Sequence, residues 1–204
     1  VMETRCEYAR GLAIAERALQ LAEHHGLLLP AGRCIEEVGI LSFKLGDYAR
    51  ATALFSRLQA INAQTGRLIR LSIGFEGILG CIALDEGRYE TGMRHLTHEL
   101  EAYEALATRR GITDAQHALA CAWRQLGHAD RGLALDTLSA QGATTISNGL
   151  SLSQALLGQA WSLRDLGRPE DALASAAQAV ALASDHTAPV TLTYALLELA
   201  QARM

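Results

Sequence analysis

The stretch Leu45-Gly46-Asp47-Tyr48 marks a sharp reversal of the chain, and its glycine recurs at nearly equal intervals. Gly87, Gly127 and Gly167 follow Gly46 at steps of 41, 40 and 40 residues. A fixed period of about 40 residues is typical of stacked-repeat proteins, in which neighbouring repeats bury one continuous core. Such proteins usually work through a long surface, so a catalytic pocket is not the first expectation.

Amphipathic segments flank each of these glycines. Their apolar residues recur at three- and four-residue steps, as Leu54, Leu58 and Ile61 do, which is the period of a helix. The segments before the glycines are 35–45, 73–84, 115–126 and 152–166, and those after them are 47–63, 89–107, 130–138 and 170–183. The sequence therefore predicts an all-α fold of antiparallel helical hairpins.

Small residues also recur inside the expected helices. Seven residues before the turns stand Gly39, Gly80, Ala120 and Ala160, and five residues after them stand Ala51, Gly92, Gly132 and Ala172. Glycine in a helix interior costs about 1 kcal/mol relative to alanine, so its recurrence needs a compensating gain. Close approach of two helices supplies one, and we expect the helices of each hairpin to touch at these positions.

Composition excludes several classes of function. The 204 residues carry a formal net charge of -4, so there is no basic face of the kind that binds nucleic acid. No apolar run approaches the roughly 18 residues of a membrane span, and no signal peptide opens the chain. Four cysteines in a chain of this length do not form a disulfide framework, which favours a reducing, cytoplasmic setting.

The repeat resembles the tetratricopeptide repeat (TPR). The resemblance rests on Gly39, Leu45-Gly46-Asp47-Tyr48, Ala51 and Phe55, and on Leu166-Gly167-Arg168-Pro169-Glu170-Asp171-Ala172 in the last hairpin. It implies a right-handed superhelical solenoid. The third repeat departs from the pattern, because Asp136 replaces a bulky apolar residue.

The period is the second departure, because tetratricopeptide repeats usually span 34 residues. The extra length predicts a longer second helix or a longer loop between repeats. Long-period arrays of this kind are similar to those of large bacterial ATP-dependent regulators, including LuxR-type activators.

The register of the repeats predicts their boundaries within a single domain, 1–204. Four repeats are expected at about 30–66, 67–110, 111–148 and 149–187, between partial repeats at 1–29 and 188–204. Because both partial repeats would expose an interface, we expect the chain to be a fragment of a longer protein.

In tetratricopeptide arrays the first helix of each hairpin lines a concave groove, and the resemblance carries this role to matching positions. The predicted partner-binding residues are Arg33, Glu36, Ile40, Phe43, Asp114, His117, Arg124, Gln154, Trp161, Arg164 and Tyr194. The same offsets place Cys81, Leu84, Cys121, Leu157 and Leu197 on this side. Aromatic residues and arginine anchor many protein interfaces, although Trp161 and Phe43 can equally serve as packing between repeats.

A metal site is the weaker interpretation of two groups. Cys81 and Cys121 lie one period apart, with His117 one turn before Cys121, and thiolates with imidazole can hold zinc. Equivalent atoms on stacked helices are typically about 8–10 Å apart, which favours small buried cysteines. His95 and His98 stand among polar residues, which favours a solvated face. No metal or other cofactor is expected.

No nucleophile elbow, phosphate-binding loop, dinucleotide fingerprint or zinc-protease helix is present. The first hypothesis is a non-enzymatic scaffold that binds a protein or peptide in its groove. The alternative is an effector-sensing segment of a bacterial multidomain transcription or signalling ATPase, with a small molecule as effector. A third hypothesis is homo-oligomerisation through the exposed repeat ends.

Overall fold

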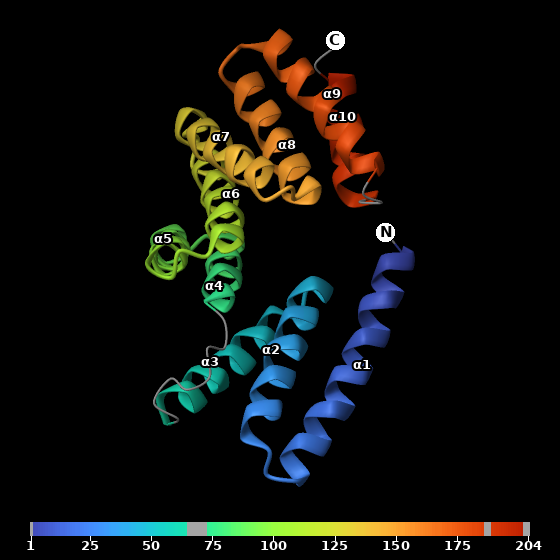
Figure 1. Cartoon of the computed structure of the whole chain (residues 1–204), viewed down its shortest axis with the longest axis vertical. Helices are drawn as coiled ribbons and strands as arrows, with labels where there is room; N and C mark the ends of the chain where they lie inside the picture. The colour runs from blue at the N-terminus through green and yellow to red at the C-terminus, as the bar shows by residue number, and fades with distance from the viewer. Residues whose placement is uncertain (1, 65–72, 186–188, 202–204) are drawn as a thin grey trace. The chain divides into compact units, whose positions relative to one another are not determined.

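The structure, a computed structural model, describes residues 2–64, 73–185 and 189–201 (Figure 1). These ranges hold ten α-helices and no strand, which confirms the all-α prediction. The helices are α1 (Met2–His24), α2 (Leu28–Leu45), α3 (Tyr48–Gln64), α4 (Gly74–Asp85), α5 (Tyr89–Ala105), α6 (Arg109–Gln125), α7 (Ala129–Thr145), α8 (Gly149–Asp165), α9 (Pro169–Asp185) and α10 (Pro189–Gln201).

The chain packs as two compact units, Val1–Ile82 and Ala83–Met204, which we call unit 1 and unit 2. In unit 1, α2 packs against both α1 and α3, and in unit 2 each helix from α5 to α10 packs against the next. Consecutive antiparallel helices are the arrangement that the short turns predict.

The turns confirm the role of the four glycines. Gly46, Gly87, Gly127 and Gly167 all have positive φ, between 72° and 87°, where a side chain would be strained. At Gly127 the turn closes with hydrogen bonds from the amide of Gly127 to the carbonyl of Arg124 and from His128 to Trp123, a Schellman-type ending.

The repeat has a finer period than the glycines reveal. From α5 to α9 every helix is 17 residues long. Each is separated from the next by three residues, so a turn recurs every 20 residues. Ala107 and Ser147 occupy the intervening turns with φ of 50° and 52°, although neither is glycine. The extra length of the long period is therefore shared equally by both helices of a repeat, rather than confined to the second helix or a loop.

The predicted boundary of α7 was wrong. The helix continues past Leu138 to Thr145, and the hydroxyls of Thr144 and Thr145 donate to the carbonyls of Ala140 and Gln141. Threonine tolerates a helix when its hydroxyl bonds the preceding turn in this way. The cap follows at Asn148, whose side chain accepts a hydrogen bond from the Ser151 amide.

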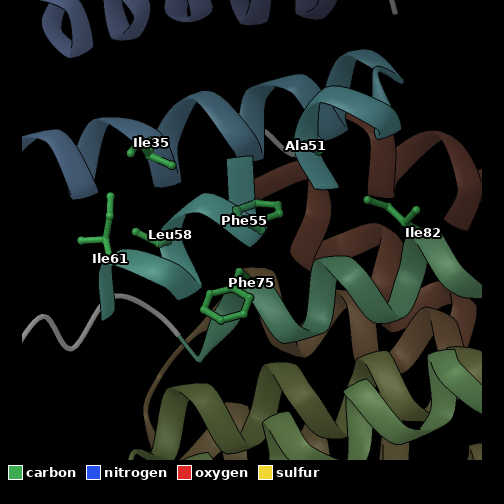
Figure 2. Packing of buried hydrophobic residues seen from close by; sticks show 7 residues of the cluster. All are labelled: Ile35, Ala51, Phe55, Leu58, Ile61, Phe75 and Ile82. Atoms are coloured by element: carbon green, nitrogen blue, oxygen red, sulfur yellow. The ribbon is translucent and has the colours of Figure 1, made fainter. Parts of the chain in front are cut away.

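The core of unit 1 is apolar and aromatic. Figure 2 shows side chains of α2, α3 and α4 pointing into one cluster, formed by Ile35, Ala51, Phe55, Leu58, Ile61, Phe75 and Ile82. The rings of Phe55 and Phe75 stack with centroids 5.9 Å apart. A Cβ on Gly39 would lie 2.8 Å from the Phe55 ring, so the glycine lets α2 and α3 approach as predicted.

The core of unit 2 is packed by small residues. Alanines on α8 and α9 are fully buried: Ala155, Ala160, Ala172, Ala176, Ala179 and Ala183. On α7 the buried face carries polar groups instead. Asp136 and Ser139 are both 0% exposed, and the Ser139 hydroxyl donates to the Thr113 carbonyl on α6. This polar helix brings a charge into the core of unit 2.

Candidate binding face and charged cluster

A charged cluster forms where α6 meets α7. His117, Cys121 and Arg124 share one side of α6, since they stand four and three residues apart. His117 Nδ1 lies 2.7 Å from Asp136 Oδ1 on α7, and Arg124 pairs with the other carboxylate oxygen. Cys121 Sγ lies 3.7 Å from His117 Nε2 and accepts from Arg124 Nη2 at 3.0 Å. We call these four residues the charged cluster.

Asp136 is the centre of the charged cluster, and its burial is complete. One repeat earlier the same place is held by Leu96, and one repeat later by Ala176, both also 0% exposed. A buried carboxylate is tolerated when it is paired and hydrogen-bonded, as it is here with an imidazole and a guanidinium. Asp136, the departure from the repeat pattern, is therefore stabilised in the core by these two partners.

The electrostatics of the cluster favour a thiolate beside an imidazolium. Burial by itself lowers the pKa of His117, but the Cys121 thiolate and the hydrogen bond to Asp136 raise it to about 10. Burial likewise raises the pKa of Cys121, yet His117 and then Arg124 lower it overall. Each of these two groups thus favours the charged form of the other.

A second group of side chains continues from the charged cluster across α8 to α10. The Arg124 guanidinium lies 5.7 Å from the centroid of the Trp161 ring. Trp161 meets Tyr194 edge to face, with centroids 6.1 Å apart. On the same helices Arg164 Nη1 donates to Glu198 Oε2 at 2.6 Å. We call Trp161, Arg164, Tyr194 and Glu198 the aromatic face.

Glu198 is an unusual member of the aromatic face, because it is 2% exposed. Burial raises the pKa of its carboxyl, and Arg164 opposes that rise. A hydrogen bond from the Trp161 side chain also opposes the rise. The carboxylate is therefore an internal part of the aromatic face.

Five of the predicted partner-binding residues of unit 2 meet in these two groups: His117, Arg124, Trp161, Arg164 and Tyr194. Asp114 lies about one turn before His117 on α6, where it accepts a hydrogen bond from the Ser151 hydroxyl on α8. Gln154 is half-buried on α8, and Leu157 belongs to an apolar core cluster.

The predicted residues of unit 1 form no comparable cluster. Arg33 and Glu36 make an ion pair on α2, with the Arg33 side chain 74% exposed. Ile40 and Phe43 pack against the apolar core, and the Phe43 ring stacks on Tyr48 at 5.6 Å.

Potential metal-ligating side chains of the described residues do not gather into a metal site. Across the described residues no group of three or more histidine, cysteine, aspartate or glutamate side chains has the geometry to hold a metal ion. In the same part of the chain, no helix combines the length and apolar character that a membrane crossing requires.

Sequence reasoning missed the roles of Asp136 and Glu198, which belong to these groups, and of Gly158, which packs against Asp136. The repeat pattern indicates Asp136 only as a departure, and it singles out neither Gly158 nor Glu198. A Cβ on Gly158 would lie 2.2 Å from Asp136 Oδ2, so the glycine gives the carboxylate its space. An acidic residue at an apolar repeat position, 22 residues before an unexplained helical glycine, was the available signal.

Comparison with solved structures decides the fold. BtubC (BKLC) from P. vanneervenii aligns with a TM-score of 0.72 over 96% of this chain and 82% of that protein, at 15% identity. TPR-like repeats of a kinesin-light-chain-type protein from P. anserina align with a TM-score of 0.59 over 92% of this chain and 99% of theirs, at 14% identity. The chain has a TPR-like fold.

The TPR-like fold confirms the predicted fold class, a solenoid of helical hairpins. At these low identities the likeness concerns the fold alone. No family model matches the sequence, and no curated protein matches it.

Proposed function

We propose that unit 2 binds a protein partner, presented as an extended peptide segment, on the aromatic face. Trp161 and Tyr194 carry this proposal, because they pair edge to face on α8 and α10 and Tyr194 remains 51% exposed. Tryptophan, tyrosine and arginine dominate the binding energy of protein interfaces. A rigid aromatic pair beside the half-exposed Arg164 is such an arrangement.

The charges on the aromatic face indicate what the segment offers. Arg164 is already paired with Glu198, so an acidic partner would have to compete with that carboxylate. Glu198 is 2% exposed and paired with Arg164, so it is not open to the partner. A peptide that places an apolar or aromatic side chain against Trp161 and Tyr194 fits the face best.

The other predicted contacts take secondary places in this proposal. The Arg124 side chain is 8% exposed and paired with Asp136. We therefore expect it to contact the Trp161 ring and not the partner. Asp114 lies on α6 with residues of the charged cluster, and Gln154 lies on α8 with residues of the aromatic face. Both extend the proposed surface along these helices. For unit 1 by itself we propose Arg33, Glu36, Ile40 and Phe43 as contacts, and the exposed Arg33 is the most accessible of them.

We propose a non-enzymatic scaffold in the cytoplasm, since a reducing compartment disfavours disulfides and Cys34, Cys81 and Cys121 form none. The regulatory alternative, an effector-sensing segment of a bacterial signalling or transcription ATPase, needs a small-molecule site. Unit 1 has a hollow of about 420 Å³ between the Glu23–Arg57 ion pair and Leu27, within the size range of ligand pockets. Leu27 and Leu28 in its lining are about half exposed, so the hollow is open to solvent. Peptide binding on the aromatic face is therefore the better-supported proposal.

A displayed library of random peptides, selected on the whole chain, tests the proposal. Enriched peptides should lose at least about tenfold in affinity on Trp161→Ala, since an aromatic anchor contributes 2 kcal/mol or more. Trp123→Ala is the matched control, because Trp123 lies on α6 against His128 and Arg131 and outside the aromatic face. Equal losses in both variants, or no enrichment at all, would contradict the proposal.

A further inference from the structure

The charged cluster has the chemistry of an activated thiol, which peptide binding does not use. The Cys121 sulfur contacts an imidazole nitrogen at 3.7 Å and a guanidinium nitrogen at 3.0 Å. The same imidazole contacts a carboxylate through its other nitrogen, at 2.7 Å. A thiol, an imidazole and a carboxylate thus stand in one chain of contacts. This order orients the imidazole toward the sulfur.

We propose that Cys121 is a site of oxidation by hydroperoxides, which convert its thiolate to a sulfenic acid. The thiolate is the form that reacts, and its reactivity follows charge and access. Cys121 is partly exposed, and the neighbouring His117 side chain is 23% exposed, so this side of α6 is open to a small solute such as a peroxide. The Arg124 side chain is 8% exposed and that of Asp136 is fully buried. Their burial fixes the positions of the groups around the sulfur.

The groups that set the charge on the sulfur come from two helices. His117 and Arg124 on α6 favour the thiolate, whereas Asp136 on α7 opposes it directly. Asp136 nevertheless supports the thiolate indirectly, because it hydrogen-bonds His117 and favours the imidazolium. Asp136 is therefore a positioning residue.

The reaction balances with the groups present. The Cys121 thiolate donates an electron pair to the terminal oxygen of the hydroperoxide, an S–O bond forms and the O–O bond breaks. The departing hydroxide or alkoxide takes a proton from the His117 imidazolium and leaves as water or an alcohol. Sulfur is oxidised by two electrons, the peroxide is reduced, and Arg124 stabilises the negative charge that shifts to the leaving oxygen.

Cys34 provides an internal control in the same folded chain. It is also free and partly exposed, and its sulfur has no described hydrogen bond or ion pair. The whole protein is treated at pH 7 with a small excess of hydrogen peroxide and with dimedone, which traps sulfenic acids. Mass spectrometry of the peptides should show Cys121 labelled at least about ten times faster than Cys34. Equal labelling, or none at Cys121, would overturn the proposal.

The role of the imidazole is tested by alkylation with iodoacetamide over a range of pH. In the wild-type chain the rate at Cys121 should rise with a midpoint below 9.0, the ordinary thiol value. His117→Gln should move this midpoint upward and slow labelling by peroxide and dimedone. The control is His128→Gln, since His128 is exposed and contacts Trp123 instead. An unchanged midpoint in His117→Gln would refute the activated thiol while leaving peptide binding untouched.

Discussion

Gly158 on α8 lies directly against the carboxylate of Asp136 on α7, and a Cβ on the glycine would stand 2.2 Å from Oδ2. That separation is far shorter than any contact two such atoms can keep. The charged cluster therefore depends on a glycine that belongs to neither of its helices. The pair explains why a helix interior keeps a residue that weakens it.

Gly158→Ala should lower the free energy of unfolding by about 1–3 kcal/mol, the usual cost of overpacking a core. Because the clash is with the carboxylate, the cost should shrink by at least about 1 kcal/mol when Asp136 is also replaced by alanine. Urea denaturation of the two single variants and the double variant measures this coupling. Strictly additive losses of unfolding free energy would show that Gly158 and Asp136 are not coupled.

Arg124→Ala should destabilise the chain by about 3 kcal/mol, because it leaves the buried Asp136 carboxylate with His117 alone. Arg168→Ala is the control, since Arg168 and Asp171 form an exposed ion pair with both side chains 55% accessible. That change should cost less than about 0.5 kcal/mol. Urea denaturation gives both values. Equal losses of unfolding free energy would show that the Arg124–Asp136 pair contributes no more than an exposed ion pair.

The turns predict two stabilising substitutions. Ala107 and Ser147 hold left-handed backbone conformations that cost a non-glycine residue about 1–2 kcal/mol. Ala107→Gly and Ser147→Gly should each raise stability by about 0.5 kcal/mol, after the larger entropy of glycine in the unfolded chain is subtracted. The reverse change, Gly127→Ala at a φ of 82°, should cost about 1 kcal/mol. Thermal denaturation measures all three variants. A lower melting temperature in both Ala107→Gly and Ser147→Gly would contradict a left-handed backbone at these turns.

The pair His117–Cys121 predicts how stability depends on pH. The pKa of His117 rises from 6.5 to about 10 on folding, because the Cys121 thiolate and Asp136 outweigh the effect of burial. Its contribution to stability is therefore complete below pH 6.5 and lost as the pH rises through about 10. The pKa of Cys121 falls from 9.0, burial opposing the change, so its contribution is complete above pH 9.0 and lost at lower pH.

Between pH 6.5 and 9.0 these two slopes cancel, since the folded and the unfolded pair each hold one proton. The stability that the pair contributes should thus be greatest in this window and fall on both sides. The difference in unfolding free energy between the wild-type chain and His117→Gln/Cys121→Ser, measured at about pH 5.5, 7.5 and 10.5, checks this. A difference that stays constant with pH would contradict the charged pair.

The sequence was a good guide to the repeat, because turns and small residues obey local rules. Gly46, Gly87, Gly127 and Gly167 were placed correctly, since only glycine adopts a left-handed backbone at little cost. The expected repeat boundaries at 110 and 148 lie close to the turns at Ala107 and Ser147. The positive φ of these two residues was not predicted, because neither residue type indicates it.

The candidate site was predictable only in outline. The offsets of the repeat correctly brought Trp161 near Arg124, since equivalent helices stack on one another. They could not show that Arg124 is used internally, because its partner Asp136 comes from the second helix of the hairpin. Nor could they show that Glu198 is buried beside Arg164, since that depends on how α10 packs on α8.

Contact between the aromatic face of unit 2 and the partner can be measured directly, because the chain has only two tryptophans, Trp123 and Trp161. A ¹⁵N-labelled chain gives one indole N–H signal for Trp161 and one for Trp123, which Trp123→Phe assigns. On saturation with a selected peptide, we expect the Trp161 signal to shift while the Trp123 signal stays in place. A shift confined to Trp123, or none at Trp161, would contradict the claim.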